Sequence, residues 1–270
     1  MFINHPSEGG GGIGSAAACV LTTPYYIYLV HCGDSKILLS RQKSPHCVIT
    51  VNHLPSHRIE EMRIKKAGGG VSHDGSIMKN SSFLSSVSRS FGYREGKNNC
   101  FLKKEEQVVI VCPTIAVESR WNEEFVVIAS KGVWDVLSAT DVQNFVRFAL
   151  TVYEDLRDIC ESIVRMAFNR ESTENIAIVL LVFEHAPKVC PVVQKEYYDH
   201  LESLEIAIKN VARYFTTSTL NQLMDILEMS DFGRKFFPGH SLYKHRELIS
   251  QVFNNKHTIY SSTNFKSYTS

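Results

Sequence analysis

The chain has 270 residues, 44% of them hydrophobic and 21% charged, so it is long and apolar enough to fold around a sizeable core. A formal net charge of +1 gives no reason to expect nucleic acid or acidic lipid as a partner. We expect neither a membrane span nor a secretory signal, because no long apolar run occurs and the first residues lack a cationic region.

The cysteines bear on the redox compartment. There are seven of them, an odd number, and most lie in apolar segments. Reduced thiols therefore fit the sequence better than a framework of disulfides. We expect an intracellular protein, cytoplasmic or nuclear.

Short apolar runs bounded by breaking residues predict β-strands, and longer periodic runs predict helices. A flexible, glycine-rich lead-in over residues 1–13 comes first. A helix over residues 58–67 is expected to bury Ile59, Met62 and Ile64 on one face. The predicted strands are residues 16–22, 25–31, 36–40, 108–112, 125–130 and 175–183.

Residues 72–104 are rich in Ser, Gly, Asn and Lys, and we expect them to be irregular. Two amphipathic helices are predicted between the last two strands, the first of them capped by Thr140. Strands followed by paired helices and a further strand favour a layered α+β sandwich over a parallel sheet.

The pattern changes after Pro187, where we predict a helical extension over residues 187–253 and a polar tail over residues 254–270. The extension is expected to pack on the core or to offer a partner a groove or helix. Its first helix carries an apolar stripe, its second follows at Leu220–Leu227, and more apolar residues come after these. The residues concerned are Tyr197, Leu201, Leu204, Ile208, Val211, Leu220, Leu223, Met224, Leu227, Phe232, Phe236, Phe237, Leu242 and Tyr243.

Six short motifs follow one another over residues 14–184. They are Gly14-Ser15 before an apolar run, Gly33-Asp34-Ser35, Asn52-His53-Leu54-Pro55, Val87-Ser88-Arg89-Ser90-Phe91-Gly92, Ala129-Ser130-Lys131-Gly132 after an apolar strand, and Ser172-Thr173-Glu174-Asn175-Ile176. In this order they resemble the metal-dependent Ser/Thr protein phosphatases of type 2C. The resemblance implies a domain over residues 14–186 with two antiparallel β-sheets packed as a sandwich and flanked by helix pairs.

The resemblance also implies a chemistry, in which carboxylates hold two Mg²⁺ or Mn²⁺ ions that activate a water for attack on phosphate. Asp34 matches an aspartate of a third, weaker metal position, and Glu174 matches a core ligand. Lys131 stands where the family has a metal-holding aspartate. At ~4 Å and an effective dielectric of ~20, a divalent ion and one unit charge interact by roughly 8 kcal/mol, so this exchange replaces an attraction by a repulsion.

A second piece of the family's metal site is also missing, because the motif D-G-H-G-G does not occur in the 270 residues. We therefore expect a degenerate, N-terminally incomplete pseudophosphatase without a bound metal. It would act as a binding or regulatory module for a protein partner, with a phosphoprotein as one candidate. The alternative is a Mg²⁺- or Mn²⁺-dependent phosphatase with residual activity.

Simpler interpretations of the same residues stay open. Asp34 fits a plain turn residue, Glu174 fits the start of a strand, and Lys131 fits a solvated lysine. A sharper hypothesis joins Lys131 and Arg89 in a cationic pocket that holds phosphate without hydrolysing it. Without the family's early strands and helices, the sheets would expose edges and apolar surface, so we expect a partner or an extension to cover them.

Overall fold

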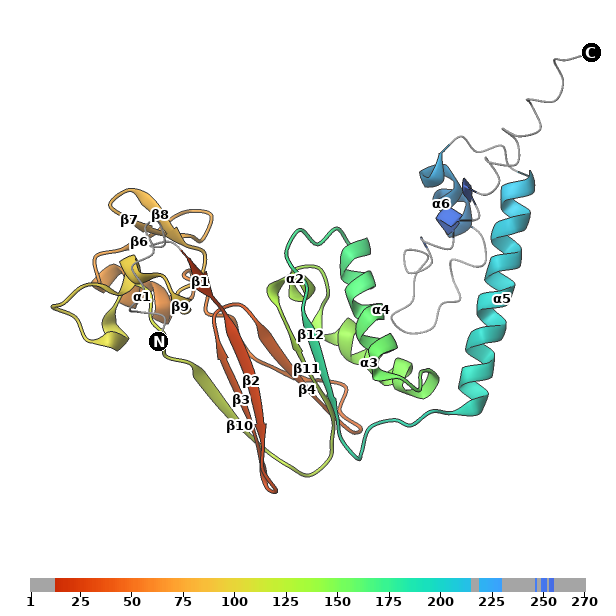
Figure 1. The fold of residues 1–270 in the computed structure, drawn as a ribbon, viewed down its shortest axis with the longest axis horizontal. Helices are drawn as coiled ribbons and strands as arrows, with labels where there is room; N and C mark the ends of the chain where they lie inside the picture. Colours follow the sequence, from red (N-terminus) through yellow and green to blue (C-terminus); the bar gives the residue numbers. More distant parts are fainter. Residues whose placement is uncertain (1–12, 215–218, 230–245, 247–248, 252, 255–270) are drawn as a thin grey trace, which may run out of the picture. The chain divides into compact units, whose positions relative to one another are not determined.

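The computed structural model describes residues 13–214, 219–229, 246, 249–251 and 253–254 (Figure 1). Most of the predicted lead-in and polar tail lies outside these residues, as do Phe232, Phe236, Phe237, Leu242 and Tyr243. The chain divides into two compact units, Met1–Asp135 with Glu174–His185, and Val136–Thr173 with Ala186–Ser270. Among the described residues, no helix is both long and apolar enough to span a membrane. All seven cysteines are free thiols, as predicted.

The first unit is built on two antiparallel sheets. One has the order β10-β3-β2, formed by Thr114–Ser119, Tyr26–Cys32 and Ala17–Thr22. The other has the order β12-β11-β4-β5, formed by Ile178–Val182, Glu123–Ala129, Lys36–Arg41 and Val48–Ile49. The predicted α+β class with antiparallel sheets is therefore confirmed. Five of the six predicted strands form, with ends within two residues of the expected ones except that β12 starts at Ile178 instead of residue 175.

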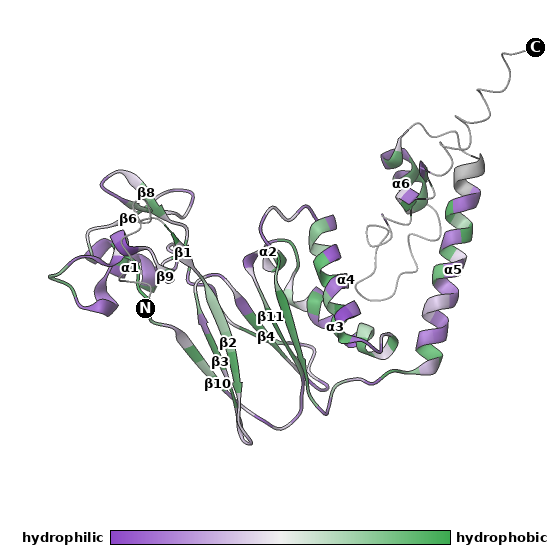
Figure 2. Cartoon of the chain, viewed as in Figure 1, coloured by the Kyte–Doolittle hydropathy of each residue, from purple (hydrophilic) through white to green (hydrophobic). Residues whose placement is uncertain are grey.

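The two sheets pack through alternate side chains of their strands. Ile27 and Leu29 of β3 and Ile37 and Leu39 of β4 are fully buried, and they form one core with Val126 of β11. Such alternation follows from the strand period of two, which places every second side chain on the same face. Figure 2 shows the apolar character of these strands.

A separate small core lies under helix α1 (Arg58–Lys66). It consists of Ile64, Ala67, Ile77, Leu84, Val108 and Val109. Around it lie β6 (Gly70–Val71), β7 (Ile77–Lys79), β8 (Ser82–Ser85), η2 (Arg94–Lys97) and η3 (Lys104–Glu106), while β1 (Gly14–Ser15) pairs with β9 (Phe91–Gly92). The expectation that residues 72–104 are irregular is therefore wrong for the β7–β8 hairpin.

Two further expectations for this region are wrong. Residues 108–112 form no strand, only a bridge between Arg89 and Ile110; Val108, Val109 and Ile110 are buried from an irregular segment, whereas Val111 is 42% exposed. Helix α1 leaves Ile59 78% and Met62 62% exposed and buries Glu60 beside Ile64. The prediction from apolar spacing was wrong for this helix because α1 turns the charged residue Glu60 inward instead of Ile59 and Met62.

The second unit is helical. It contains α3 (Ala139–Val152), α4 (Leu156–Asn169), α5 (Pro191–Tyr214) and α6 (Leu220–Met229), while the one-turn α2 (Lys131–Trp134) belongs to the first unit. The cap of α3 is Ser138, whose hydroxyl accepts a hydrogen bond from the Asp141 amide, rather than Thr140. The two helices predicted for the extension form, and α5 and α6 share a core with Ile249, whose other members are Leu204, Ile208, Leu223, Met224 and Leu227.

The sandwich core generates a test of the sheet assignment. Leu29→Ala removes a fully buried side chain between the sheets, so we expect the free energy of unfolding to fall by about 2–5 kcal/mol. Leu21→Ala, on the outer face of β2 where Leu21 is 58% exposed, should change it by less than about 1 kcal/mol. Urea unfolding followed by tryptophan fluorescence measures both, and equal losses would contradict the assignment of the two faces.

Candidate functional site

Lys131 is the first residue of α2, directly after strand β11 ends at Ala129. Its Nζ donates hydrogen bonds to two carboxylates, Asp135 Oδ2 and, at 3.0 Å, Glu174 Oε1. Burial works to lower the pKa of Lys131, but these two hydrogen bonds and charges outweigh it and hold the pKa above its usual value. The lysine is therefore a cation fixed between two anions, not a solvated lysine free of partners.

The backbone brings Glu174 to this place. Ser130 Oγ donates to the Asn175 carbonyl at 2.9 Å and accepts from the Ala177 amide at 2.9 Å. A Cβ at Gly132 would lie 2.9 Å from the carbonyl oxygens of Glu174 and Asn175, so glycine is needed for this close approach. Glu174 thus does more than start a strand, since the turn after β11 holds it against Lys131.

Asp34 lies in the Gly33–Ser35 turn between β3 and β4, within electrostatic reach of the same group. Burial raises the pKa of Asp34, while its own backbone amide and the Lys131 charge oppose the rise, and Asp135 and Glu174 add to it. Lys36, at the start of β4, has a pKa lowered by burial and raised in part by Asp135. The structure therefore brings Asp34, Lys131 and Glu174 together and adds Asp135 and Lys36.

These residues do not fit the metal centre that the resemblance implies. Among the residues that the structure describes, no group of three or more His, Cys, Asp or Glu side chains is arranged to hold a metal ion. The carboxylates of Asp135 and Glu174 point their oxygens at an ammonium, which carries hydrogen-bond donors and no ligand atom. Mg²⁺ and Mn²⁺ require several oxygen ligands, so this cluster offers them a cation in place of a ligand.

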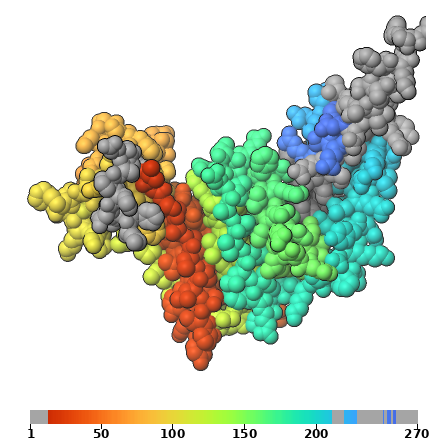
Figure 3. Space-filling model, in the orientation of Figure 1, coloured from red at the N-terminus to blue at the C-terminus, as the bar shows by residue number. Residues whose placement is uncertain are grey.

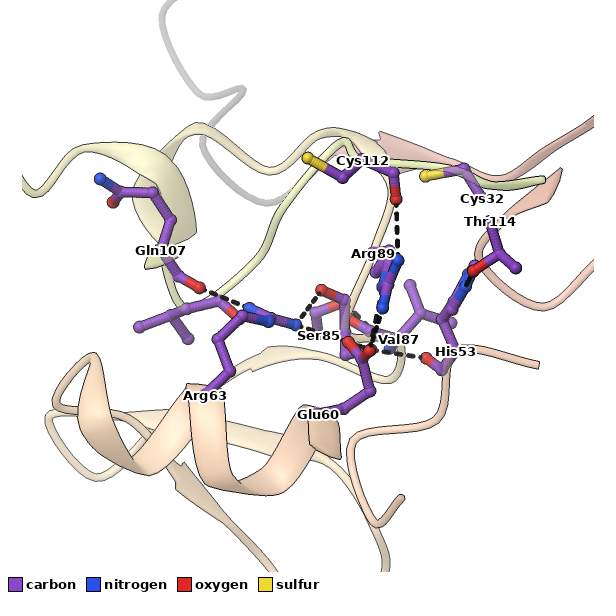
Figure 4. A network of polar contacts seen from close by, with 12 residues as sticks. Cys32, His53, Glu60, Arg63, Ser85, Val87, Arg89, Gln107, Cys112 and Thr114 are labelled. Atoms are coloured by element: carbon purple, nitrogen blue, oxygen red, sulfur yellow. Dashed lines mark hydrogen bonds and ion pairs between the residues drawn. The ribbon is translucent and has the colours of Figure 1, made fainter. Parts of the chain in front are cut away.

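Arg89 belongs to a different network (Figure 4). Its guanidinium donates to Glu60 Oε1, from Nε at 3.0 Å and from Nη2, and to the Cys112 carbonyl at 3.2 Å. Glu60 also accepts from Arg63 Nη2 at 2.7 Å and from Ser88 Oγ at 2.6 Å. The two cations of the hypothesised phosphate pocket are thus neutralised by separate carboxylates, and that pocket stays a prediction that these contacts do not favour.

Glu60 is the charged residue that α1 buries. Its side chain is 5% exposed, and burial works to raise its pKa, but the hydrogen bonds from Arg89, Ser88 and Arg63 outweigh this and lower the pKa to about 2. The carboxylate ties α1 to the segment around residue 88. Arg63 lies three residues along the same helix, but no local pattern marked Glu60 as buried, because its other two partners, Ser88 and Arg89, are 28 and 29 residues away.

His53 positions the turn that carries Asp34. Its Nδ1 accepts from the Gly33 amide at 3.0 Å, its own amide donates to the Gly33 carbonyl at 3.0 Å, and its Nε2 contacts Thr114 Oγ1 at 2.8 Å. The ring stacks on His31 with 4.4 Å between centroids. Burial, followed by the charges of Arg89 and His31, lowers the pKa of His53 to about 4.

The geometry above can be compared with known proteins. The protein phosphatase 2C family model matches residues 7–176. The chain belongs to the protein phosphatase 2C family. This membership agrees with the six motifs and with the antiparallel sheets of the first unit.

The curated relatives are phosphatases of the same family. Human protein phosphatase 1A is 29% identical over 258 residues, which cover 93% of this chain and 65% of the relative. Mouse protein phosphatase 1B is 32% identical over 244 residues, covering 89% of this chain and 61% of the relative. The chain thus spans less than two thirds of the length of either relative. A coverage of 93% exceeds what residues 1–186 could supply, so the similarity to 1A reaches into the C-terminal helices.

Solved structures show the same fold. Serine-threonine phosphatase 2C from Toxoplasma gondii aligns with a TM-score of 0.51 and 20% identity over 63% of this chain and 58% of that chain. A Caenorhabditis elegans sex-determining protein aligns with a TM-score of 0.53 and 21% identity over 63% of this chain and 40% of that chain. At these identities the likeness concerns the fold alone.

Asp135 and Lys36 are the residues of the Lys131 cluster that sequence analysis missed. A signal for Asp135 was present, because a lysine and an aspartate four residues apart on a helical turn lie on the same face. Lys36 carried no such signal, since it reaches the cluster only through the pairing of β4 with β11 at Ala129. Trp134 is buried beneath this turn, with Nε1 donating to the Ala129 carbonyl at 2.9 Å.

The Glu60 network predicts a large effect of removing one charge. Glu60→Gln leaves Arg63 and Arg89 without their carboxylate in a buried place, so we expect a loss of about 3–5 kcal/mol in the free energy of unfolding. Glu61→Gln, one residue along the same helix, removes only an exposed pair with Lys65 and should cost less than about 1 kcal/mol. Urea unfolding compares the two, and similar losses would contradict a structural role of Glu60.

The shifted pKa values of His53 and Glu60 predict how the stability of the fold changes in acid. The folded-state pKa of His53, about 4, lies below its ordinary 6.5, so the unfolded chain binds the proton more readily. Stability from His53 is complete above pH 6.5 and falls by up to about 3 kcal/mol as the pH drops toward 4. Glu60, shifted from 4.5 to about 2, adds a further loss between those two pH values.

Urea unfolding between pH 7.5 and 4 measures the first of these windows. The expected result is a continuous decline that begins near pH 6.5 in the unmodified protein and is much shallower in His53→Gln. A profile that stays flat down to pH 4.5 in the unmodified protein would show that His53 is not held neutral.

Proposed function

We propose that this chain is a non-catalytic member of the phosphatase 2C family, a pseudophosphatase, that acts as a binding or regulatory module for another protein. The proposal rests on two ion pairs, which join Lys131 Nζ to Asp135 and to Glu174. Glu174 matches a core metal ligand of the family, and here its carboxylate is neutralised by an ammonium that belongs to the chain.

The physical argument is one of charge and ligand count. A divalent ion entering this cluster would meet a positive charge, and Lys131 would have to leave both carboxylates before they could bind metal. The raised pKa of Lys131 makes loss of its proton at neutral pH still less favourable. Without metal, no group of the cluster can activate water and neutralise a phosphoryl group in the way that the family's chemistry requires.

The contacts of Arg89 and Lys131 bear on how a partner protein would bind. A phosphoprotein would have to displace Glu60 from Arg89, or Asp135 and Glu174 from Lys131, before either cation could hold its phosphate. Binding through surfaces outside the former catalytic cluster is therefore the better supported mode, and the partner is a protein.

Metal binding and turnover test the proposal together. Isothermal titration of Mn²⁺ into the purified protein should give no saturable heat at millimolar ion, and a phosphopeptide should not be hydrolysed above background. Lys131→Asp restores a carboxylate and should bind Mn²⁺ measurably more tightly, since it exchanges a repulsion for an attraction. Lys131→Gln is the matched control, which removes the charge without adding a ligand.

The alternative, a Mg²⁺- or Mn²⁺-dependent phosphatase with residual activity, is supported by the nearness of Asp34, Asp135 and Glu174. Turnover of phosphopeptide by the unmodified protein, abolished by a chelator and absent in Glu174→Gln, would establish that alternative and overturn the proposal. Equal, weak Mn²⁺ binding by Lys131→Asp and Lys131→Gln would show that charge at residue 131 does not control the site.

A further inference from the structure

Two cysteines that are far apart in the sequence come together where strand β10 begins. Cys32 is the last residue of β3, and Cys112 lies two positions before Thr114, the first residue of β10. The two strands pair antiparallel, with Thr114 opposite His31. Continuing this register places Pro113 opposite Cys32. Cys112 is therefore the next residue along the chain from the one that faces Cys32.

The backbone separation of the two cysteines fits a disulfide. Paired residues of antiparallel strands lie about 5 Å apart and successive residues about 3.4 Å, so the register places the two Cα atoms roughly 6 Å apart. Cysteines joined by a disulfide usually have Cα atoms about 4.4–6.8 Å apart. A bond between Cys32 and Cys112 therefore requires no large movement of the backbone.

The Cys32 side chain already lies against the peptide unit of Cys112. Its Sγ is 3.8 Å from the Val111 carbonyl oxygen. This oxygen and the Cys112 Cα belong to one planar peptide unit, in which they are about 2.8 Å apart. The Cys32 sulfur is therefore within roughly 6.6 Å of the Cys112 Cα.

The Cys112 side chain has to rotate before a bond can form. In Figure 4 the Cys32 sulfur points toward Cys112, whereas the Cys112 sulfur points away. Cys112 is half-buried and belongs to no helix or strand, so its side chain can change between staggered positions about the Cα–Cβ bond. One such rotation turns its sulfur toward Cys32.

The two thiols differ in their access to solvent. Cys32 is 2% exposed, while Cys112 is only half-buried. The sheet that carries Cys32 is at the surface, where Figure 3 shows β2 and β3 in red. A small oxidant can therefore reach Cys112 first, and Cys32 stands behind it as the second thiol.

Positive charges lie beside both thiols. Arg89 Nη1 donates to the Cys112 carbonyl at 3.2 Å. Burial raises the pKa of Cys32, and the charges of Lys97 and Arg89 oppose this rise. Cys112 and Glu60 act in the same direction as burial, so Cys112 is also within electrostatic reach of the Cys32 sulfur. Nearby cations favour the thiolate, which is the form of cysteine that reacts with oxidants.

We propose that Cys32 and Cys112 are a redox-active pair, at which hydrogen peroxide reversibly closes a disulfide. The proposal goes beyond the binding role proposed above and does not depend on it, because it involves no residue of the Lys131 cluster and no metal. Oxidation would give the chain two forms that differ by one covalent bond.

One molecule of hydrogen peroxide supplies the oxidation. The Cys112 thiolate attacks one peroxide oxygen, so an S–O bond forms, the O–O bond breaks, and the departing hydroxide takes up the proton that the thiol released. Cys32 then loses its proton and attacks the sulfur of the Cys112 sulfenic acid, so the S–S bond forms and the S–O bond breaks, with hydroxide and that proton leaving as water. Two thiols are oxidised and the peroxide is reduced to two waters. A thiol such as glutathione reverses the change by exchange.

The bond would clamp the segment that carries the Glu60 network. It closes a loop from residue 32 to residue 112, which contains α1 and the partners of Glu60. Cys32 also directly precedes Gly33, whose amide donates to His53. Oxidation is therefore expected to stabilise the first unit against unfolding and to restrain the turn that carries Asp34.

Treatment of the full chain with one equivalent of hydrogen peroxide, followed by mass spectrometry, tests the proposal. The monomer should lose two hydrogen atoms, and dithiothreitol should restore the original mass. Chymotrypsin cleaves between Cys19 and Cys32, after Tyr25, so a non-reducing digest should yield one cross-linked pair of peptides with Cys32 and Cys112. The midpoint of urea unfolding should rise on oxidation, because the cross-link restricts the unfolded chain.

Variants locate the pair. Cys112→Ser should abolish both the loss of mass and the rise of the midpoint. Cys32→Ala should leave Cys112 as a sulfenic acid, which dimedone traps as an adduct. Cys100→Ser is the matched control at an exposed cysteine and should oxidise like the unmodified chain. Circular dichroism checks that each variant is folded, and Cys112→Ser, at a half-buried residue, keeps the test decisive where Cys32→Ala fails to fold.

Three results would overturn the proposal. The first is an unchanged mass in peroxide, with both thiols still free. The second is a disulfide that joins Cys32 or Cys112 to any other cysteine, in the same chain or in a second copy. The third is a Cys112 sulfinic acid in the unmodified chain without a cross-link, since Cys32 would then be out of reach. None of these results bears on whether the Lys131 cluster binds metal.

Discussion

An ammonium held between two carboxylates is the interaction on which this account depends. Lys131 donates to Asp135 and Glu174 at the point where β11 turns into α2, a place that the family resemblance assigns to a metal ligand. The lysine supplies the positive charge that keeps these carboxylates together, so the turn can keep its shape without an ion. The same charge opposes the entry of a divalent cation, and on this ground we propose that the chain keeps the fold of a phosphatase without its chemistry.

The rest of the first unit supports that arrangement in ordinary ways. Gly132 lets the Glu174 segment approach, Ser130 binds it, and His53 fixes the turn that carries Asp34. A second ionic group, Glu60 with Arg63 and Arg89, anchors α1.

Most strands of the two sheets could be predicted from the sequence, because continuous apolar runs such as those in β4 and β11 identify buried strands without reference to distant residues. The failures share one cause, which is that burial depends on distant partners. Val108 and Val109 are buried without belonging to a strand, since they pack in the core under α1. Glu60 is buried because Arg63, Ser88 and Arg89 surround its carboxylate. Of the cluster around Lys131, three members came from motifs, whereas Lys36 required the strand register.

A crystal structure determined from crystals soaked in manganese, with anomalous scattering recorded, tests the central claim most directly. The account predicts that Lys131 Nζ stays within hydrogen-bond distance of Asp135 and Glu174 and that no anomalous peak lies beside them. A pair of well-occupied manganese ions among Asp34, Asp135 and Glu174, with the lysine side chain turned away, would contradict it.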